Sequence, residues 1–461
     1  MSGTDSAKTP SAESHQAKNS SRTHSAKSHS KMHSTKTRLL FLVATDTYFC
    51  SHRLNLAKAA LNEGFEVALA TRCTSEHHKT LIEDVGIKIF PLKFFDRSTI
   101  HPYKQVLILK ELYNIYKRYC PHIVHHVAIK PVVFGSLVAK LCRVPRIINA
   151  LGGLGYLFTE SRDHSNLKKI KKTFLRASVR ILFRKFFSNP NTTLILQNQD
   201  DINTLIKSTK IPKKHITLIP GAGIDISAFP PLPAPSESSP IIITCISRML
   251  WNKGIGELVL AAKLLKIKFN KHEQQNSENN ENQEIKENRE NQQNKENQEN
   301  KNANCDKVEF PPFKIILYGT PDPENPASIN LTTLQEWHDS GVIEWRGHCD
   351  NILQAYQETH IAVLPSYREG MPKSLLEAAS LARPIVTTDV PGCRDIVVHN
   401  ENGLLVPPQN ADALAQALMV LCKDEELRNK MGQLSRQRVE TYFKDSIIHE
   451  KTIELYRNNT F

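Results

Sequence analysis

The chain has 461 residues, of which 40% are hydrophobic and 23% are charged, and its formal net charge is +13. This length allows two domains with sizeable cores, and the longest apolar runs are too short for the roughly 18 residues of a membrane span. The positive charge favours an anionic partner, which can be a nucleic acid, an acidic membrane face or a phosphate-bearing substrate.

The nine cysteines are scattered along the chain, and no two of them form a C-x-x-C pair. An odd number without paired spacing argues against a disulfide framework and a zinc site, and it favours a reducing compartment. The first residues contain no apolar stretch of the kind that a secretory signal has. We therefore expect a cytoplasmic protein.

Two segments have a biased composition. Residues 1–37 are rich in Ser, Lys, His and Thr and contain no Val, Ile, Leu or Phe. Such a segment cannot bury enough apolar surface to offset the entropy lost on ordering, so we predict a disordered basic tail. Residues 270–306 consist mainly of Asn, Gln, Glu and Lys without a heptad pattern, which predicts a solvated low-complexity insertion in a surface loop.

Between these segments, short apolar runs alternate with amphipathic stretches of helix length. One such stretch, around 53–63, is followed by Gly64, a residue that suits the end of a helix. The alternation predicts parallel sheets with crossover helices. The expected strands are 39–44, 65–70, 87–92, 122–127, 146–151 and 193–197, followed after residue 240 by 241–247, 313–319, 341–345, 360–365, 384–389 and 403–407.

Residues 226–240 contain five prolines, and such a segment is typical of a semi-rigid linker. We therefore predict an α/β protein of two doubly wound, Rossmann-like domains, residues 38–225 and 241–440, that face a cleft. Open α/β sheets bind ligands at the carboxyl ends of their strands. We expect residues 441–461 to form a helix that packs back towards the first domain.

The first expected strand leads into "CSHRLNLAKAA", which places His52 and Arg53 at a strand-to-helix turn. Either side chain can contact the phosphate of an acceptor. The alternative is an ordinary helix start with a buried Leu54, and the sequence does not decide between the two.

Three further candidates follow in the first domain. His125 and His126 belong to one strand, and strand alternation sends them to opposite faces, so at most one of them points into the cleft. Lys130 comes directly after this strand. Gly152 and Gly153 follow the next one, where glycines allow a tight turn and close approach of a ligand to the backbone. We place Lys130 and the two glycines on the acceptor side.

Residues 167–187 predict a basic amphipathic helix. Lys172, Arg176, Arg180 and Arg184 recur at every fourth position, with apolar residues on another face. This pattern suits contact with an anionic membrane surface. The alternative is the solvated face of an ordinary packed helix.

In the second domain, Arg248 follows a strand, and Lys253 stands where the next helix opens. Two cations beside a helix start can neutralise a departing diphosphate. Further on, Arg346, Gly347 and His348 form a turn after a strand, and we expect Asp350 to cap the helix that follows.

The stretch "LPSYREGMPKSLLEA" places Glu369 and Gly370 on a loop after a strand, and Pro372 suits the first turn of the next helix. Backbone N–H groups at such a helix start are available to an anion. Glu377 falls about one and a half turns into the helix, where a carboxylate can accept hydrogen bonds from a ribose diol.

The spacing of Glu369 and Glu377, with its flanking residues, resembles the E-x7-E motif of retaining GT-B glycosyltransferases of family 4. The likeness extends over most of residues 38–460. It implies that Arg248 and Lys253 hold a donor diphosphate, that Glu369 holds the donor sugar and that Glu377 holds the ribose. It also implies a functional histidine near His126, which we take as a catalytic candidate with Glu369, Arg248 and Lys253. The implied donor site consists of Arg248, Lys253, Arg346, Gly347, His348, Glu369, Gly370, Met371, Pro372, Ser374, Leu375 and Glu377.

The form "SHRLNLA" resembles a subgroup that acts on lipid-linked saccharides and on lipopolysaccharide and capsule precursors. This implies a UDP-linked hexose or N-acetylhexosamine donor, a polyprenyl-linked acceptor and work at the inner face of the cytoplasmic membrane. The family typically lacks a D-x-D metal motif, and none occurs here, so we expect no metal and no cofactor.

Three alternatives stay open. A sugar-nucleotide epimerase can share this architecture and needs no separate acceptor. A basic nucleic-acid-binding protein would need aromatic residues interleaved with Lys and Arg or a known module, and neither occurs. A catalytically inactive sugar-nucleotide binder is opposed by the intact Glu369, Glu377, Arg248 and Lys253.

Overall fold

The computed structural model describes residues 36–95, 101–153, 184, 187, 189–236, 240–270 and 311–457. The expected basic tail and low-complexity insertion lie outside these residues except at their edges. The expected membrane-binding helix, residues 167–187, lies outside them apart from Arg184 and Phe187. The described residues from Thr37 onward belong to one compact unit.

The first half of this unit is built on a sheet of seven parallel strands in the order β3-β2-β1-β4-β5-β6-β7. All six strands predicted here are present, and only the short β7 was not foreseen. The strands are β1 (Arg38–Thr45), β2 (Glu66–Arg72), β3 (Lys88–Pro91), β4 (Ile123–Val127), β5 (Arg146–Ala150), β6 (Thr192–Leu196) and β7 (Ile216–Leu218).

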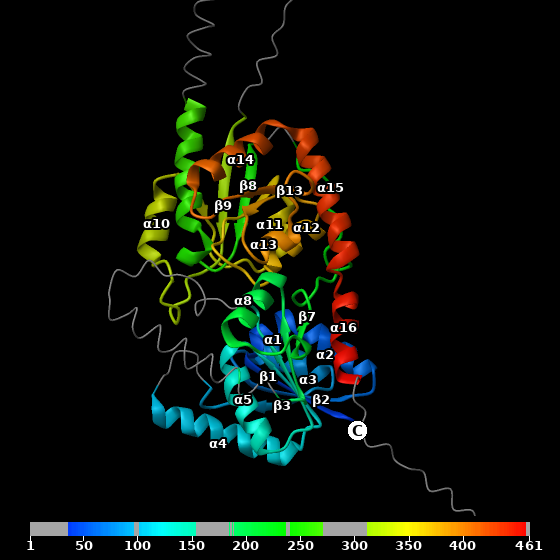
Figure 1. Cartoon of the computed structure of the whole chain (residues 1–461). Coiled ribbons are helices and arrows are strands. Elements are labelled where there is room, and N and C mark those ends of the chain that lie inside the picture. The colour runs from blue at the N-terminus through cyan, green and yellow to red at the C-terminus, as the bar shows by residue number, and fades with distance from the viewer. Residues whose placement is uncertain are drawn as a thin grey trace, which may run out of the picture. The chain divides into compact units, whose positions relative to one another are not determined.

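Helices cover both faces of this sheet (Figure 1). Leu39 and Phe41 of β1 pack against α1, α2, α3 and α16, whereas Leu40 and Leu42 pack on the other face against α4 and α5. Burial on both faces explains why β1 is a continuous apolar run without alternation. The helices are α1 (Asp46–His52), α2 (Leu54–Asn62), α3 (Glu76–Asp84), α4 (Pro102–Tyr119), α5 (Ile129–Leu141), α8 (Gln199–Thr209) and α16 (Asp445–Arg457).

The second half contains a sheet of six parallel strands in the order β10-β9-β8-β11-β12-β13. These are β8 (Ile241–Ile246), β9 (Phe313–Tyr318), β10 (Glu344–Trp345), β11 (Ile361–Leu364), β12 (Ile385–Thr388) and β13 (Gly403–Val406). The labelled helices are α10 (Leu331–Asp339), α11 (Ile352–Gln357), α12 (Lys373–Ser380), α13 (Cys393–Ile396), α14 (Ala411–Lys423) and α15 (Glu425–Tyr442), and residues 255–270 are also helical. The predicted pair of doubly wound α/β sheets is therefore confirmed.

The proline-rich segment after residue 225 has no helix or strand among its described residues and is fixed to the second half. Arg383 donates to the carbonyl of Pro233 at 2.9 Å, and Ser380 donates to that of Phe229 at 2.8 Å. The chain returns to the first half after α15, and Tyr456 of α16 bonds His125 of β4 at 2.6 Å between Oη and Nδ1.

No helix in the described ranges is long and apolar enough to cross a membrane.

Candidate functional site

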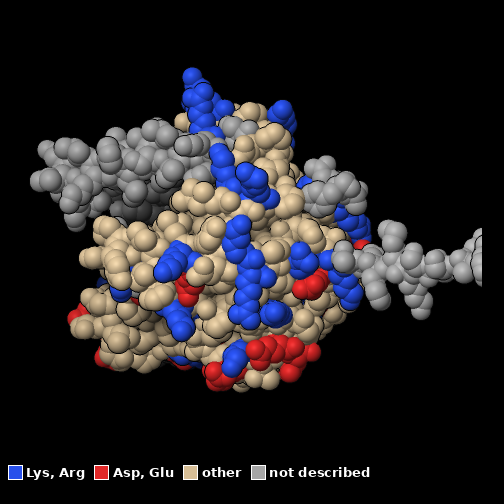
Figure 2. All heavy atoms as spheres, turned by 90° about the horizontal axis from the view of Figure 1, so that it is seen from below, with Lys and Arg blue, Asp and Glu red and all other residues tan. Residues whose placement is uncertain are grey.

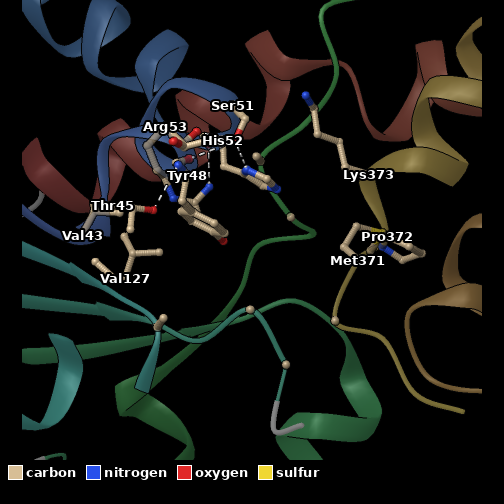
Figure 3. Close-up of a pocket in the computed structure, with 18 of the residues that line it drawn as sticks. Val43, Thr45, Tyr48, Ser51, His52, Arg53, Val127, Met371, Pro372 and Lys373 are labelled. Atoms are coloured by element: carbon tan, nitrogen blue, oxygen red, sulfur yellow. Dashed lines mark hydrogen bonds between the residues drawn. The ribbon is translucent and has the colours of Figure 1, made fainter. Parts of the chain in front are cut away.

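A cavity of about 980 Å³ lies where loops at the carboxyl ends of both sheets meet. Figure 3 shows His52 and Arg53 across this cavity from Met371, Pro372 and Lys373. Parallel α/β sheets bind ligands at this end of their strands. The cavity is therefore the candidate active site, and its lining includes residues from β1, α1, β4, α5 and β8 and from the loop before α12.

The cavity wall is strongly basic. Among the described residues, six Lys or Arg side chains line it, against a single carboxylate, that of Glu369. The six are Arg53, Arg72, Lys130, Arg248, Lys253 and Lys373. Such an excess of positive charge in a concave site favours a polyanionic ligand, because the low-dielectric walls concentrate the field.

The structure brings together Arg248, Lys253 and Glu369, as the sequence predicted. Lys253 Nζ lies 2.5 Å from Glu369 Oε1, and both side chains are less than one-fifth exposed. Arg248 is 55% exposed and pairs with Asp322 at 2.8 Å. Lys253 is thus already fixed at the cavity wall, whereas Arg248 has to leave a surface ion pair to reach a ligand.

Residues of the first half hold the loop that carries Glu369. Asn198 donates its side-chain amide to the carbonyl of Gly370 at 3.0 Å, and Arg368 pairs with the fully buried carboxylate of Asp201. A Cβ on Gly370 would lie 2.0 Å from the carbonyl oxygen of Gly152 and 2.4 Å from Gln197 Oε1. Only glycine therefore fits at this contact between the two halves.

Replacing Gly370 by alanine is expected to lower sugar transfer at least about 10-fold, because the backbone of Gly152 cannot move aside as a flexible side chain can. Gly152→Ala controls for folding alone, because Gly152 lines the cavity and its added Cβ would meet nothing closer than 3.8 Å. Melting curves and transfer assays measure the effect. Full activity of the Gly370→Ala protein would show that this contact is absent from the working enzyme.

The start of α12 forms the second-half wall of the cavity. Met371, Pro372 and Ser374 line it, but Leu375 and Glu377 do not. Glu377 is 5% exposed and pairs with Lys373 at 3.2 Å. Burial raises the pKa of its carboxyl, and Lys373 opposes the shift. The ribose contact predicted for Glu377 requires its carboxylate to turn towards the cavity, and it stays a prediction.

The turn at residues 346–348 lies outside the cavity lining. Arg346 bonds Glu344 at 2.6 Å and Tyr318 at 2.7 Å, and it also pairs with Glu358. His348 is largely exposed, 3.7 Å from Asp350. Contact with the nucleotide base therefore stays a prediction for this turn, including Gly347. The helix cap predicted at Asp350 is wrong by one residue, because Asn351 accepts the capping bond from the amide of Gln354.

All five residues predicted on the acceptor side line the cavity: His52, Arg53, Lys130, Gly152 and Gly153. The His52 ring stacks on Tyr48 with centroids 4.2 Å apart. Burial, with Arg53 and Lys373 nearby, lowers the pKa of His52 to about 3. His52 is consequently neutral at physiological pH and adds no charge to the wall.

The catalytic role predicted for His126 has no support in the geometry. Its side chain is fully buried between β4 and α4, where it bonds Tyr116 Oη at 2.9 Å and Asn149 Oδ1 at 2.7 Å. Burial lowers its pKa to about 4. His125 is equally buried on the opposite face. Neither ring lines the cavity, so we remove His126 from the candidate residues.

Several lining residues were not foreseen. Arg72 ends β2 and Lys373 begins α12, while Gln197, Gly221 and Gly223 come from other loops of the same edge. The sequence held a signal for Arg72 and Lys373, since both are cations at a strand end or a helix start. Within the described part of the chain, no group of three or more His, Cys, Asp or Glu is arranged to hold a metal ion.

Two family models match successive parts of the chain. The family described as "Glycosyl transferase 4-like" matches residues 38–185, and "Glycosyl transferases group 1" matches residues 300–424. The first range contains most of the first sheet, and the second contains the loop of Glu369. Together the two matches cover more than half of the chain.

Two curated proteins are similar along nearly the whole chain. One is the N,N'-diacetylbacillosaminyl-diphospho-undecaprenol alpha-1,3-N-acetylgalactosaminyltransferase of Campylobacter jejuni, 24% identical over 91% of this chain and 98% of that protein. The other is the UDP-Gal:alpha-D-GlcNAc-diphosphoundecaprenol alpha-1,3-galactosyltransferase of Escherichia coli, 24% identical over 86% of this chain and 89% of that protein.

Solved structures share the fold. The sucrose-phosphate synthase of Thermosynechococcus elongatus superposes with a TM-score of 0.65 at 18% identity, over 92% of this chain and 98% of that chain. HepE of Anabaena, in complex with UDP and glucose, superposes with a TM-score of 0.64 at 16% identity, over 92% of this chain and all of that chain. With the two family matches, one in each half, and the transferases similar along its length, the chain is a glycosyltransferase with the GT-B fold.

Proposed function

We propose that the enzyme transfers a hexose or an N-acetylhexosamine from a UDP-sugar to a saccharide carried on a polyprenyl diphosphate, with retention of the anomeric configuration. The observation that carries this proposal is the basic cavity in which Lys253 and Glu369 meet 2.5 Å apart. A diphosphate donor and a diphosphate-linked acceptor both need positive charge, and the cavity supplies it from both halves.

The relatives support the choice of substrates. The name of the Escherichia coli relative states a UDP-galactose donor and a diphosphoundecaprenol acceptor, and that of the Campylobacter jejuni relative states an acceptor of the same kind. Both names specify an α linkage, and UDP-galactose is itself an α-glycoside, which favours retention. The relatives named above are transferases, and this favours transfer over epimerisation.

Arg248 and Lys253 act on the leaving group in this proposal. As the bond between C1 of the sugar and the diphosphate oxygen breaks, negative charge develops on UDP, and the two cations stabilise it. The acceptor hydroxyl forms the new bond to C1, and its proton is released with UDP. The positive charges of Arg248 and Lys253 do the work that a metal ion does in other transferases, so we propose transfer without a metal.

Glu369 orients the donor sugar by accepting a hydrogen bond from one of its hydroxyl groups. Its carboxylate is held by Lys253, so a donor that draws Lys253 to its diphosphate frees one oxygen for the sugar. Backbone N–H groups at Gly370 and Met371 lie beside the same position at the start of α12 and can bond the phosphates. Glu377 is proposed for the ribose.

A donor screen tests this function. Purified full-length protein is incubated with UDP-glucose, UDP-galactose, UDP-N-acetylglucosamine or UDP-N-acetylgalactosamine and a short-chain polyprenyl-diphospho-N-acetylglucosamine. We expect UDP release and a lipid-linked disaccharide with one donor, an α linkage by NMR and an unchanged rate in EDTA. Conversion of the donor without acceptor would identify an epimerase, and no turnover with any donor would contradict the proposal.

We also propose that the protein binds an anionic membrane surface peripherally, because its proposed acceptor is lipid-linked. The sequence offers residues 167–187 as one membrane-binding surface, and the structure offers a second one on α4. Tyr103, Val106, Lys110, Tyr113 and Lys117 recur at helical spacing, and all five side chains are exposed. The single acidic residue of α4, Glu111, accepts bonds from two backbone amides. In Figure 2, which views the molecule from below, Lys and Arg gather near the middle of the face.

Liposome flotation separates the two candidate surfaces. Replacing three α4 lysines by glutamine should weaken binding to phosphatidylglycerol vesicles about 100-fold, since each surface cation contributes about 1 kcal/mol. A second variant neutralises three arginines of the other segment, and a control neutralises three lysines elsewhere. The α4 variant changes Lys104, Lys110 and Lys117, and the second variant changes Arg176, Arg180 and Arg184. The control changes Lys207, Lys430 and Lys451. Equal binding by all three variants would contradict a role in membrane binding for both surfaces.

A further inference from the structure

The basic side chains of the cavity fall into two groups that differ in their partners. The three from the second half are all ion-paired: Arg248 with Asp322, Lys253 with Glu369 and Lys373 with Glu377. In the first half, neither Arg53 nor Arg72 has a carboxylate partner within the described ranges. Arg53 and Arg72 thus bring positive charge to the first-half wall that no described carboxylate pairs with.

Arg53 gives the stronger evidence for an anion site, because its side chain is buried and only 6% of the residue is exposed. Its Nη1 donates to the carbonyl of His52 at 3.0 Å, and its Nε is buried without any acceptor. A buried guanidinium with an unused donor and no counter-ion costs several kcal/mol. An anion that enters the cavity beside Arg53 would remove that cost.

Strand order gathers the first-half cations at one place. Arg72 ends β2 and is the register partner of Thr45, which ends β1. Lys130 follows β4, which pairs with β1 on its other side. Neighbouring strands lie about 4.8 Å apart, so the backbones that carry Arg72 and Lys130 flank β1 at roughly two strand spacings. Arg53 joins α1 to α2, and all three side chains line the same cavity.

Among the described residues of the first half, none with a carboxylate lines the cavity. The nearest carboxylate by sequence, Asp46, is fully buried and does not line the cavity. It accepts bonds from the amides of Thr47 and Thr74 at 2.8 Å and from that of Ser75 at 3.1 Å. The neutral His52 adds no repulsion and no charge. An anion is the ligand that this wall fits.

We infer that Arg53, Arg72 and Lys130 form a second anion subsite, separate from the donor site at Arg248 and Lys253, and that it holds the diphosphate of the polyprenyl-diphosphate acceptor. This inference rests on the proposed function for the identity of its ligand. A second subsite on the opposite wall places the acceptor saccharide between the two diphosphates. It also explains why the cavity carries more positive charge than one nucleotide-sugar needs.

Kinetics with two acceptors test the subsite. One acceptor is N-acetylglucosamine on a short polyprenyl diphosphate, and the other is the same sugar on an uncharged alkyl chain. We expect the wild-type enzyme to prefer the diphosphate acceptor, and Arg53→Gln and Arg72→Gln each to lower that preference about 10- to 100-fold. The KM for the UDP-sugar should change little. Arg143→Gln is the matched control, because Arg143 is exposed and does not line the cavity.

Direct binding provides a readout that does not require turnover. Farnesyl diphosphate is titrated calorimetrically into the wild-type protein saturated with UDP, and into each variant. We expect binding to the wild type and the Arg143→Gln protein, weaker binding to Arg53→Lys and loss of binding in Arg53→Gln and Arg72→Gln. Melting curves establish that each variant is folded, and the partly exposed Arg72 keeps the test valid if Arg53→Gln does not fold.

The outcomes separate this subsite from the proposed function. Absence of transfer with every donor would overturn the proposed function, while farnesyl diphosphate binding that depends on Arg53 and Arg72 would still support an anion subsite. Equal loss of activity with both acceptors, or a raised KM for the UDP-sugar alone, would overturn the subsite and leave the transferase in place. Unchanged farnesyl diphosphate binding in both variants would overturn it as well.

Discussion

Replacing Glu369 by glutamine is expected to lower sugar transfer at least about 100-fold while the protein stays folded. The substitution keeps the shape of the side chain and removes its charge. Glutamine cannot hold Lys253 as an ion-pair partner, and its amide offers a weaker acceptor to a sugar hydroxyl than a carboxylate does. The loss should therefore appear in kcat, because the donor sugar is no longer held in the reactive orientation.

UDP binding distinguishes this explanation from a general loss of the site. Because Glu369 forms an ion pair with Lys253 and so competes with the diphosphate for it, the Glu369→Gln protein should bind UDP at least as tightly as the wild type. Glu401→Gln, at an exposed position outside the cavity, serves as the control for activity. Wild-type transfer by the Glu369→Gln enzyme would remove Glu369 from the mechanism.

Replacing Lys253 by glutamine should have an effect of similar size, with a different kinetic signature. Its side chain is 16% exposed, so its charge acts on the diphosphate with little screening by solvent. We expect a higher KM for the UDP-sugar together with a lower kcat, for a combined loss of about 100- to 1,000-fold in kcat/KM. Steady-state kinetics with varied donor measure both.

Arg248→Gln provides the comparison for Lys253. Arg248 is 55% exposed and bound to Asp322, so its loss should cost less than that of Lys253, although it should still lower transfer markedly. Lys253→Arg keeps the charge and should recover part of the activity. A larger loss from Arg248→Gln than from Lys253→Gln would show that the ligand-bound arrangement differs from the one described here.

The fold followed from local patterns. Both faces of each sheet are covered, so the strands are short continuous apolar runs, and such runs are visible in the sequence without knowledge of their partners. Glycine positions were equally informative, because Gly64 has φ +86° after α2 and Gly370 is needed where two backbones meet. These requirements act over a few residues or on one position, and a single sequence displays them.

The site was predicted less completely, because its contacts join distant segments. His126 and Lys130 follow one another closely in the chain, yet α4 covers the histidine and leaves the lysine at the cavity. The contacts of Asn198 with Gly370 and of Asp201 with Arg368 link positions more than 160 residues apart. Whether a polar residue supports a loop or faces a ligand depends on such packing, which no local pattern reports.

Titration calorimetry with a UDP-sugar tests the central claim most directly. The claim is that Lys253, Arg248 and Glu369 bind one UDP-sugar in the cavity between the two sheets. The wild-type protein should bind its UDP-sugar with a dissociation constant between about 1 µM and 1 mM, and Lys253→Gln should weaken that binding at least about 10-fold. No measurable binding of any UDP-sugar to the folded protein, or equal affinity in the variant, would contradict the account.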